Sequence, residues 1–223
     1  MHISIFELFS IGIGPSSSHT VGPMRAAATF LDDLRNAGLL DSTARLRADL
    51  FGSLGLTGKG HGTDTAVILG FEGELPETVD PSGVSDRLER IAAEKQLNMA
   101  GERMISFTQK NDLVFNRREV MRAHPNGMRF RAYDSDGQEL LAEAFYSIGG
   151  GFIIREHEMA QELEARAAAE VPYPFDTADE LIGHCNQHGI STSDVMYANE
   201  CALCHSKFPY HETMRTKVPC YQT

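Results

Sequence analysis

The sequence predicts an α+β domain, with an antiparallel or mixed sheet and packed helices, followed by a short helical segment. Hydrophobic residues make up 42% of the 223 residues, which is enough for a real core. Several segments repeat apolar residues every three or four positions, the spacing of an amphipathic helix. Residues 44–51 and 128–133 alternate apolar and polar side chains, which is typical of half-buried strands.

The first distinctive element is a polar loop at residues 12–23, with the sequence GIGPSSSHTVGP. Its glycines and prolines restrict the backbone, and Pro23 suits the first turn of a helix whose apolar residues recur as far as Leu34. Residues 16–20 therefore precede a helix N-terminus, where free N–H donors favour a carboxylate or phosphate. The alternative is that these residues only cap the helix and satisfy the turn.

A predicted strand at residues 44–51 leads into a second glycine-rich loop, residues 52–64, with the sequence GSLGLTGKGHGTD. This loop opens onto the apolar residues 66–70, which we expect to lie in a helix. Two loops of this kind, each followed by a helix, favour a binding site in the same domain.

The middle of the chain predicts one helix and then a series of strands. Residues 84–98 carry an apolar face at helical spacing, and their charges form a solvated side. Short strands are predicted at residues 105–107, 113–115, 128–133 and 140–148. We expect these strands to form an antiparallel meander. Glycines 149–151 end it, either as a bulge or where a ligand or another segment comes close.

The composition shifts at residue 156 towards Glu, Ala and His, and residues 171–175 (VPYPF) form a rigid connector. Two short helices are expected at residues 177–189 and 191–205, and the remaining residues show no periodicity. The sequence thus predicts a first domain, a connector with a helical segment, and an irregular tail, at residues 1–155, 156–205 and 206–223.

Charge and hydropathy exclude two classes of partner. The net charge of −11 repels nucleic acid, and only Arg117, Arg118 and Arg122 form a short basic cluster. No apolar run approaches the roughly 20 residues that cross a bilayer. The N-terminus lacks the features of a signal peptide, so we expect a cytoplasmic protein that binds neither nucleic acid nor membrane.

All four cysteines lie late in the chain, and we expect reduced thiols. Cys201, Cys204 and His205 match the pattern for c-type haem attachment, but that chemistry requires export and no export signal is present. Zinc or an iron-sulfur cluster, with Cys220 as a further ligand, is the alternative to free thiols on a helix. The residues alone predict no metal site, and Cys185 has no assigned role.

Five motifs together resemble the N-terminal beta domain of the single-chain, iron-sulfur L-serine dehydratases (L-serine ammonia-lyases) of bacteria. They are GIGPSSSHTVGPM at 12–24, FGSL at 51–54 with TGKGHGTD at 57–64, HPNGM at 124–128, YSIGGGF at 146–152 and VPYPF at 171–175. The resemblance covers about residues 1–207. Several of these motifs are individually specific, and their order and spacing agree with the family.

The resemblance implies that L-serine loses water and then ammonia to give pyruvate, without pyridoxal phosphate. In that family an oxygen-labile four-iron four-sulfur cluster acts as the Lewis acid. The resemblance also implies homodimers, and a fold similar to the allosteric substrate-binding domain of some phosphoglycerate dehydrogenases.

Site residues follow from the same resemblance. His61 is the candidate base, because an imidazole titrates near neutral pH and flanking glycines give it reach. Asp64 either orients His61 or caps the following helix. His124 is either a second catalytic residue or the cap of a turn. The residues expected to bind substrate are Ser16, Ser17, His19 and Thr20, which would hold the carboxylate, and Asn126.

The chain departs from the family in one respect. The family's cluster cysteines belong to a catalytic alpha domain that begins soon after the position of residue 207, whereas this sequence ends at Thr223. We therefore expect a truncated product or one part of a split enzyme, whose partner carries the cluster. A non-catalytic serine- or anion-binding regulatory module is the main alternative. A weaker one is a metalloprotein that uses Cys201, Cys204, His205 and Cys220.

Overall fold

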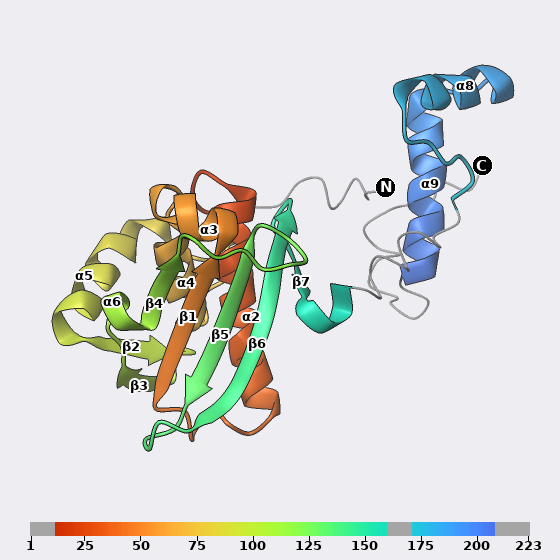
Figure 1. The fold of residues 1–223 in the computed structure, drawn as a ribbon. Helices are drawn as coiled ribbons and strands as arrows, with labels where there is room; N and C mark the ends of the chain where they lie inside the picture. Colours follow the sequence, from red (N-terminus) through yellow and green to blue (C-terminus); the bar gives the residue numbers. More distant parts are fainter. Residues whose placement is uncertain (1–11, 160–170, 208–223) are drawn as a thin grey trace. The chain divides into compact units, whose positions relative to one another are not determined.

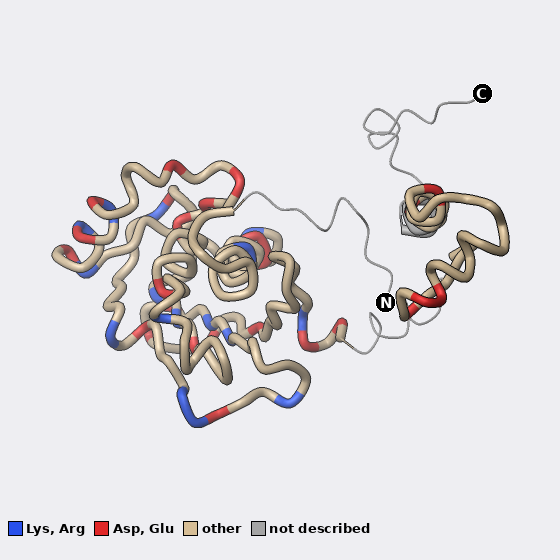
Figure 2. Tube along the Cα trace, turned by 90° about the horizontal axis from the view of Figure 1, so that it is seen from above, with Lys and Arg blue, Asp and Glu red and all other residues tan. Residues whose placement is uncertain are grey.

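A computed structural model of the chain describes residues 12–159 and 171–207. These residues belong to two compact units, which divide between residues 159 and 160 (Figure 1). No helix in the described ranges is long and apolar enough to cross a membrane. Figure 2 shows Lys and Arg interspersed with Asp and Glu, so the described part of the chain presents no basic stripe.

The first unit contains a mixed seven-stranded sheet in the order β2-β3-β1-β5-β6-β7, and β4 also pairs with β1. β1 runs parallel to β3 and β4 and antiparallel to β5. The strands are β1 (Arg45–Phe51), β2 (Gln96–Met99), β3 (Arg103–Ser106), β4 (Leu113–Asn116), β5 (Gly127–Tyr133), β6 (Glu139–Gly149) and β7 (Phe152–Arg155). The predicted α+β class with a mixed sheet and packed helices is confirmed.

Two helices, α2 (Gly22–Asn36) and α4 (Thr63–Phe71), cover one face of this sheet (Figure 1). Pro23 lies in the first turn of α2, as the sequence predicts. The remaining helices are α3 (Gly52–Thr57), α5 (Val84–Glu94) and α6 (Gln109–Asp112). Shorter turns are the π-helical η1 (Ser17–Val21) and the 3-10 turns η2 (Gly58–His61), η3 (Pro81–Gly83) and η4 (Glu156–Glu158).

Phe130 on β5 is at the centre of the core between the sheet and these helices. Its ring centroid lies 5.9 Å from that of Phe30, 5.2 Å from that of Phe71 and 5.8 Å from that of Phe145. All four side chains are fully buried. Such aromatic contacts stabilise the packing of α2 and α4 on the sheet beyond simple area burial.

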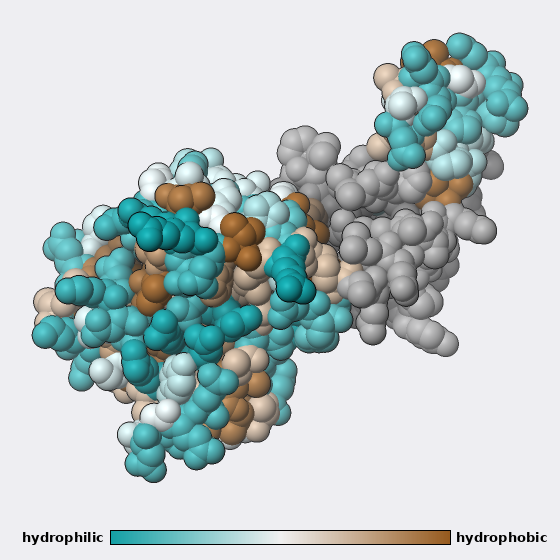
Figure 3. All heavy atoms as spheres, viewed as in Figure 1, coloured by the Kyte–Doolittle hydropathy of each residue, from teal (hydrophilic) through white to brown (hydrophobic). Residues whose placement is uncertain are grey.

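The opposite face of the sheet carries a smaller apolar cluster that includes Phe51, Met121 and Tyr146. The Tyr146 hydroxyl donates to Glu156 of η4 at 2.8 Å, and burial together with this carboxylate raises the pKa of Tyr146 to about 12. In the view of Figure 3, much of the surface of this unit is hydrophilic. Part of this face is an ionic cluster in which Arg47 and Arg131 donate to the buried Asp49.

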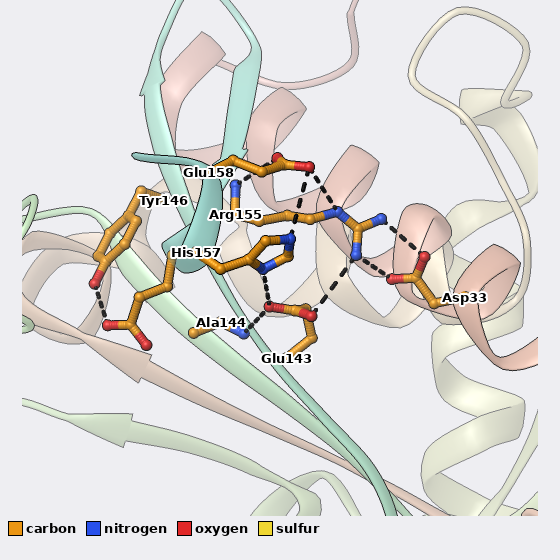
Figure 4. A network of polar contacts seen from close by, with 8 residues as sticks. Asp33, Glu143, Ala144, Tyr146, Arg155, His157 and Glu158 are labelled. Carbon is orange, nitrogen blue, oxygen red and sulfur yellow. Dashed lines mark hydrogen bonds and ion pairs between the residues drawn. The ribbon is translucent and has the colours of Figure 1, made fainter. Parts of the chain in front are cut away.

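Arg155 anchors the last strand of the unit to helix α2 (Figure 4). Its guanidinium donates to both carboxylate oxygens of Asp33, at 2.7 and 2.8 Å, and stacks over the Phe145 ring at 5.3 Å. Glu143 and Glu158 lie 3.8 and 3.7 Å from the same guanidinium. The end of the first unit is therefore fixed to its core by a bidentate ion pair.

Several sequence predictions about this unit were wrong. The helix predicted at residues 84–98 ends at Glu94, because Lys95 adopts a left-handed φ of 55° and the next four residues pair with β3 as a strand. The expected meander is antiparallel only from β5 to β7, since β3 and β4 run parallel to β1. Most of the predicted loop at 52–64 is helical, and β7 was not predicted.

The second unit contains helices α8 (Ala178–His188) and α9 (Thr192–Lys207), which confirms both predicted helices. Thr177 and Glu180 form a capping box at the start of α8, and Gly189 ends it with a φ of 62°. The side-chain amide of Asn199 on α9 accepts from the backbone N–H of Tyr173 in the connector and donates to the carbonyl oxygen of the same residue. Of the predicted irregular tail, residues 206–207 belong to α9 and residues 208–223 lie outside the described residues.

Candidate active site

The polar segment before α2, which was predicted as a loop, is folded into the π-helical turn η1. Ser16 caps this turn, since its hydroxyl accepts from the His19 amide at 3.1 Å. Its carbonyl accepts from the amides of Thr20 and Val21 at 3.0 and 3.3 Å. These three amides are used within the chain, so a ligand here would rely mainly on side chains.

The imidazole of His19 is held at both nitrogen atoms by hydroxyl groups. Its Nδ1 lies 2.9 Å from Ser18 Oγ, and its Nε2 lies 3.0 Å from Ser53 Oγ on α3. Burial lowers the pKa of His19, and nearby His61 lowers it further, while hydrogen bonding to Ser53 opposes this shift. His19 is therefore a neutral, oriented imidazole at neutral pH.

His61 lies at the end of η2, with its ring centroid 4.9 Å from that of His19 and the ring planes at 45°. Its Nδ1 lies 2.9 Å from the carbonyl oxygen of Thr57. Because a carbonyl can only accept, the Nδ1 atom must carry the proton. In the neutral ring the Nε2 atom then has a lone pair, and no hydrogen bond from the described residues reaches it. That geometry suits a general base.

The segment 124–126 docks against the same helix α3. The Ser53 amide donates to the carbonyl of Pro125 at 2.9 Å. His124 Nδ1 accepts from the Asn126 amide at 3.1 Å, and burial lowers the pKa of His124. The Asn126 side chain donates to the carbonyl of Ser147 at 3.1 Å. Both sequence-predicted residues of this motif are thus brought to the edge of the His19 site.

Asp64 and Thr20 are engaged elsewhere. One Asp64 oxygen accepts from the Thr65 amide at 3.0 Å and the other from Gln109 at 3.2 Å. Asp64 thus lies in the first turn of α4, where a negative charge suits the helix N-terminus, although Gly62 is the N-cap residue. The Thr20 hydroxyl is buried and donates to the carbonyl of His61 at 2.8 Å. Ser17, by contrast, is exposed.

Sequence reasoning missed the residue that joins the motifs, Ser53. Its hydroxyl contacts His19 and its amide contacts Pro125. A side chain at the preceding residue, Gly52, would place its Cβ 2.2 Å from the Pro125 carbonyl oxygen, and the φ of Gly52 is 54°. A glycine before a serine at the end of a strand was the available indication of this close contact. Ser18 was missed because nothing distinguished it from its neighbours.

The described residues do not fit an iron-sulfur cluster. They include no group of three or more His, Cys, Asp or Glu side chains that could hold a metal ion. Cys185 and Cys201 are free thiols in the second unit. The side chains of Cys204 and His205, and all of Cys220, lie outside the described residues.

Comparison with known families decides the relationship. The family model of the serine dehydratase beta chain matches residues 4–158, more than half of the chain. The chain belongs to the serine dehydratase beta chain family. For this family member, the resemblance inferred from the five motifs is confirmed.

Curated relatives of this chain are longer proteins named L-serine dehydratase. The L-serine dehydratase of Streptomyces coelicolor is 48% identical over 202 residues, which cover 91% of this chain and 44% of the relative. L-serine dehydratase 1 of Escherichia coli is 45% identical over 92% of this chain and 44% of its own length. The Haemophilus influenzae L-serine dehydratase is 41% identical with similar coverage. The chain therefore spans less than half the length of these relatives.

Proposed function

We propose that this chain forms the substrate-binding and proton-accepting wall of an L-serine dehydratase active site, which converts L-serine to pyruvate and ammonia. The observation that carries this proposal is the tautomer of His61, whose Nδ1 is fixed by Thr57 and whose Nε2 is left to accept a proton. The relatives that match 90–92% of the chain are named L-serine dehydratases, which supports serine as the substrate.

His61 acts as the general base in this proposal. Its Nε2 takes the α proton of serine, and the imidazolium that results keeps its Nδ1 donor on the Thr57 carbonyl. His19 stays neutral beside it, because burial and the neighbouring ring disfavour a second positive charge. One imidazole thus moves a proton, while the other orients the site.

In this proposal the hydroxyls of Ser16, Ser17 and Ser18 bind the carboxylate of the substrate. Ser17 is exposed and Ser16 and Ser18 are partly exposed, and all lie within three residues of His19. Hydroxyl and neutral imidazole N–H groups are suitable donors for a carboxylate. His124 and Asn126 border the site from the segment that docks on α3.

The four-iron four-sulfur cluster belongs, in this proposal, to the region that the relatives have and this chain does not span. A Lewis acid there would assist departure of the serine hydroxyl, and pyridoxal phosphate is not needed. The described residues offer no ligand set for it, and in this proposal the partner region supplies one. We also propose a homodimer, and a first unit similar to the allosteric substrate-binding domain of phosphoglycerate dehydrogenases.

A chimaeric enzyme tests the proposal. Residues 1–207 of this chain are joined to the C-terminal region of the Streptomyces coelicolor relative, and the protein is prepared without oxygen. We expect serine-dependent pyruvate formation. His61→Ala should lower kcat by about 100-fold or more, the usual contribution of a general base, with little change in serine affinity. Lys59→Ala, in the same turn and exposed, is the matched control.

The outcomes separate the candidate functions. A chimaera that binds serine in calorimetry but forms no pyruvate would favour the regulatory module. A His61→Ala chimaera that retains full turnover would refute the assignment of the base while leaving the reaction in place. A chimaera that neither binds serine nor forms pyruvate would count against both functions.

A further inference from the structure

Two threonines form a reciprocal pair of hydrogen bonds between the histidine-bearing segments. Thr20, next to His19, donates its hydroxyl to the carbonyl of His61 at 2.8 Å. Thr63, two residues after His61, donates its hydroxyl to the carbonyl of His19 at 2.5 Å. Each threonine thus bonds the backbone of the other segment's histidine, across 41 and 44 residues of sequence. We refer to this pair of bonds as the threonine clasp.

Both hydroxyls of the threonine clasp are shielded from water. Thr20 is 4% exposed and Thr63 is fully buried. A buried hydroxyl–carbonyl bond meets little competition from water, and leaving its partners unpaired is costly. The Thr20 hydroxyl therefore does not suit direct contact with a substrate, which is the role expected from the family motif.

Glycines in both motifs provide the space for this contact. A Cβ at Gly14 would lie 2.7 Å from Thr20 Cγ2, and a Cβ at Gly58 would lie 2.8 Å from Thr63 Oγ1. Both distances are shorter than real Cβ contacts, so a larger residue at either position would displace the threonine behind it. The two glycine-rich segments are thus shaped around the threonine clasp as well as around the imidazoles.

The threonine clasp fixes the histidines at their backbones, and other bonds fix their rings. His19 is held by Ser18 and Ser53, and His61 by the Thr57 carbonyl. With both ends fixed, the ring centroids stay 4.9 Å apart. A shift of either backbone would change the distance between the rings and the access of water to His19.

We propose that Thr20 and Thr63 are positioning residues, which hold His19 and His61 as a fixed pair through each other's backbone. Neither residue contacts the reacting atoms. The catalytic consequence rests on the proposed function of His61, whereas the structural part concerns this chain alone. The two parts are therefore tested separately.

The first experiment measures the pKa values of His19 and His61 by NMR titration of the full chain. Thr20→Val and Thr63→Val keep the shape of the side chain and remove its donor, and Thr20→Ser and Thr63→Ser keep the donor. We expect the valine variants to raise the pKa of His19 towards its ordinary value of about 6.5, since the ring gains water and loses its close neighbour. The serine variants should stay near the wild type.

His184 and His188 serve as internal references in this titration, because they belong to the second unit. Unchanged reference signals show that the second unit is unaffected, and dispersed ring signals of the buried Phe130 show that the first unit is folded. Folded valine variants that leave the His19 pKa at its wild-type value would overturn the proposal, even if their melting temperature falls. If the valine variants do not fold, the serine variants provide the test. A serine variant whose His19 pKa equals that of the denatured chain would refute the proposal.

The double variant Thr20→Val/Thr63→Val tests whether the bonds act as one unit. If they do, the second substitution should add less to the shift in the His19 pKa than it does alone. Fully additive shifts would refute a coupled clasp. In the chimaeric enzyme, the valine variants should lower kcat about tenfold with little change in KM, and the serine variants should recover most of it. An inactive wild-type chimaera contradicts the proposed function and leaves the NMR result decisive for the threonine clasp.

Discussion

The Nε2 atom of His19 lies 3.0 Å from the hydroxyl of Ser53, although the two residues are 34 positions apart in the sequence. The amide of the same serine donates to the carbonyl of Pro125 at 2.9 Å. Ser53 thus joins the serine-rich turn, the start of α3 and the segment that carries His124. Its position at the start of α3, just after β1 ends, explains how distant motifs meet in one place.

Ser53→Ala should lower turnover in the chimaeric enzyme. The substitution removes the hydroxyl partner of His19 and keeps the amide bond to Pro125. Loss of one partly buried hydrogen bond corresponds to about a tenfold drop in kcat/KM. Ser135→Ala, at an exposed turn, is the control. Unchanged kinetics in Ser53→Ala would show that His19 is oriented without it.

Gly58→Ala and Gly60→Ala should have opposite effects. A Cβ at Gly58 would lie 2.8 Å from Thr63 Oγ1, whereas a Cβ at Gly60 would meet nothing within 4 Å. We expect Gly58→Ala to lower the free energy of unfolding by about 1–3 kcal/mol through overpacking. Gly60→Ala should be neutral or stabilise by up to about 1 kcal/mol, because alanine has less freedom when unfolded. Urea denaturation measures both, and equal effects would contradict the predicted contact.

Arg155→Ala should destabilise the first unit more than Arg35→Ala. The side chains of Arg155 and Asp33 are 22% and 23% exposed and share two hydrogen bonds, while Arg35 is 47% exposed beside exposed acids. A charge-assisted bidentate pair at this burial contributes about 1–3 kcal/mol, and an exposed pair contributes less than about 1 kcal/mol. Chemical denaturation of each variant gives the comparison. A larger loss from Arg35→Ala would show that the anchor on α2 is unimportant.

Stability should fall as the solution becomes acidic. Burial lowers the pKa of His124, and burial with the neighbouring His61 lowers the pKa of His19. Below about pH 6.5 the unfolded chain therefore binds protons that the folded chain does not, so the free energy of unfolding decreases as pH falls from there towards the folded pKa. This contribution is fully present above about pH 6.5.

His124→Gln tests this pH dependence. The variant should lose less stability than the wild type between about pH 7.5 and pH 5.5, because one of the two imidazoles whose pKa is lowered by folding is gone. The measurement is the urea midpoint at each pH. Parallel curves for the two proteins would exclude His124 as a source of the pH dependence.

Local patterns in the sequence were sufficient for several elements. The Pro23 start and apolar spacing predicted α2, alternation predicted β1 and β5, and the turn at residues 135–137 preceded the predicted strand that became β6. Residues 96–98 were assigned to the helix predicted at residues 84–98. Pairing with β3 outweighed this local preference. The parallel pairing of β4 with β1 was likewise hidden, since no local pattern specifies a partner strand.

The sequence by itself determined the family and the chemical groups of the candidate site. The five motifs place the serines, His19, His61, His124 and Asn126 in the chain, and their residue types limit the chemistry to hydroxyl donors and imidazole bases. Only the tertiary structure decided which atoms are in use. The Thr57 carbonyl selects the His61 tautomer, and Ser53 orients His19. In the threonine clasp the Thr20 hydroxyl donates to the His61 carbonyl, so it does not bind the substrate. The reason is physical: a hydrogen bond depends on a partner within about 3 Å and on exclusion of water, and both come from packing rather than from the order of residues.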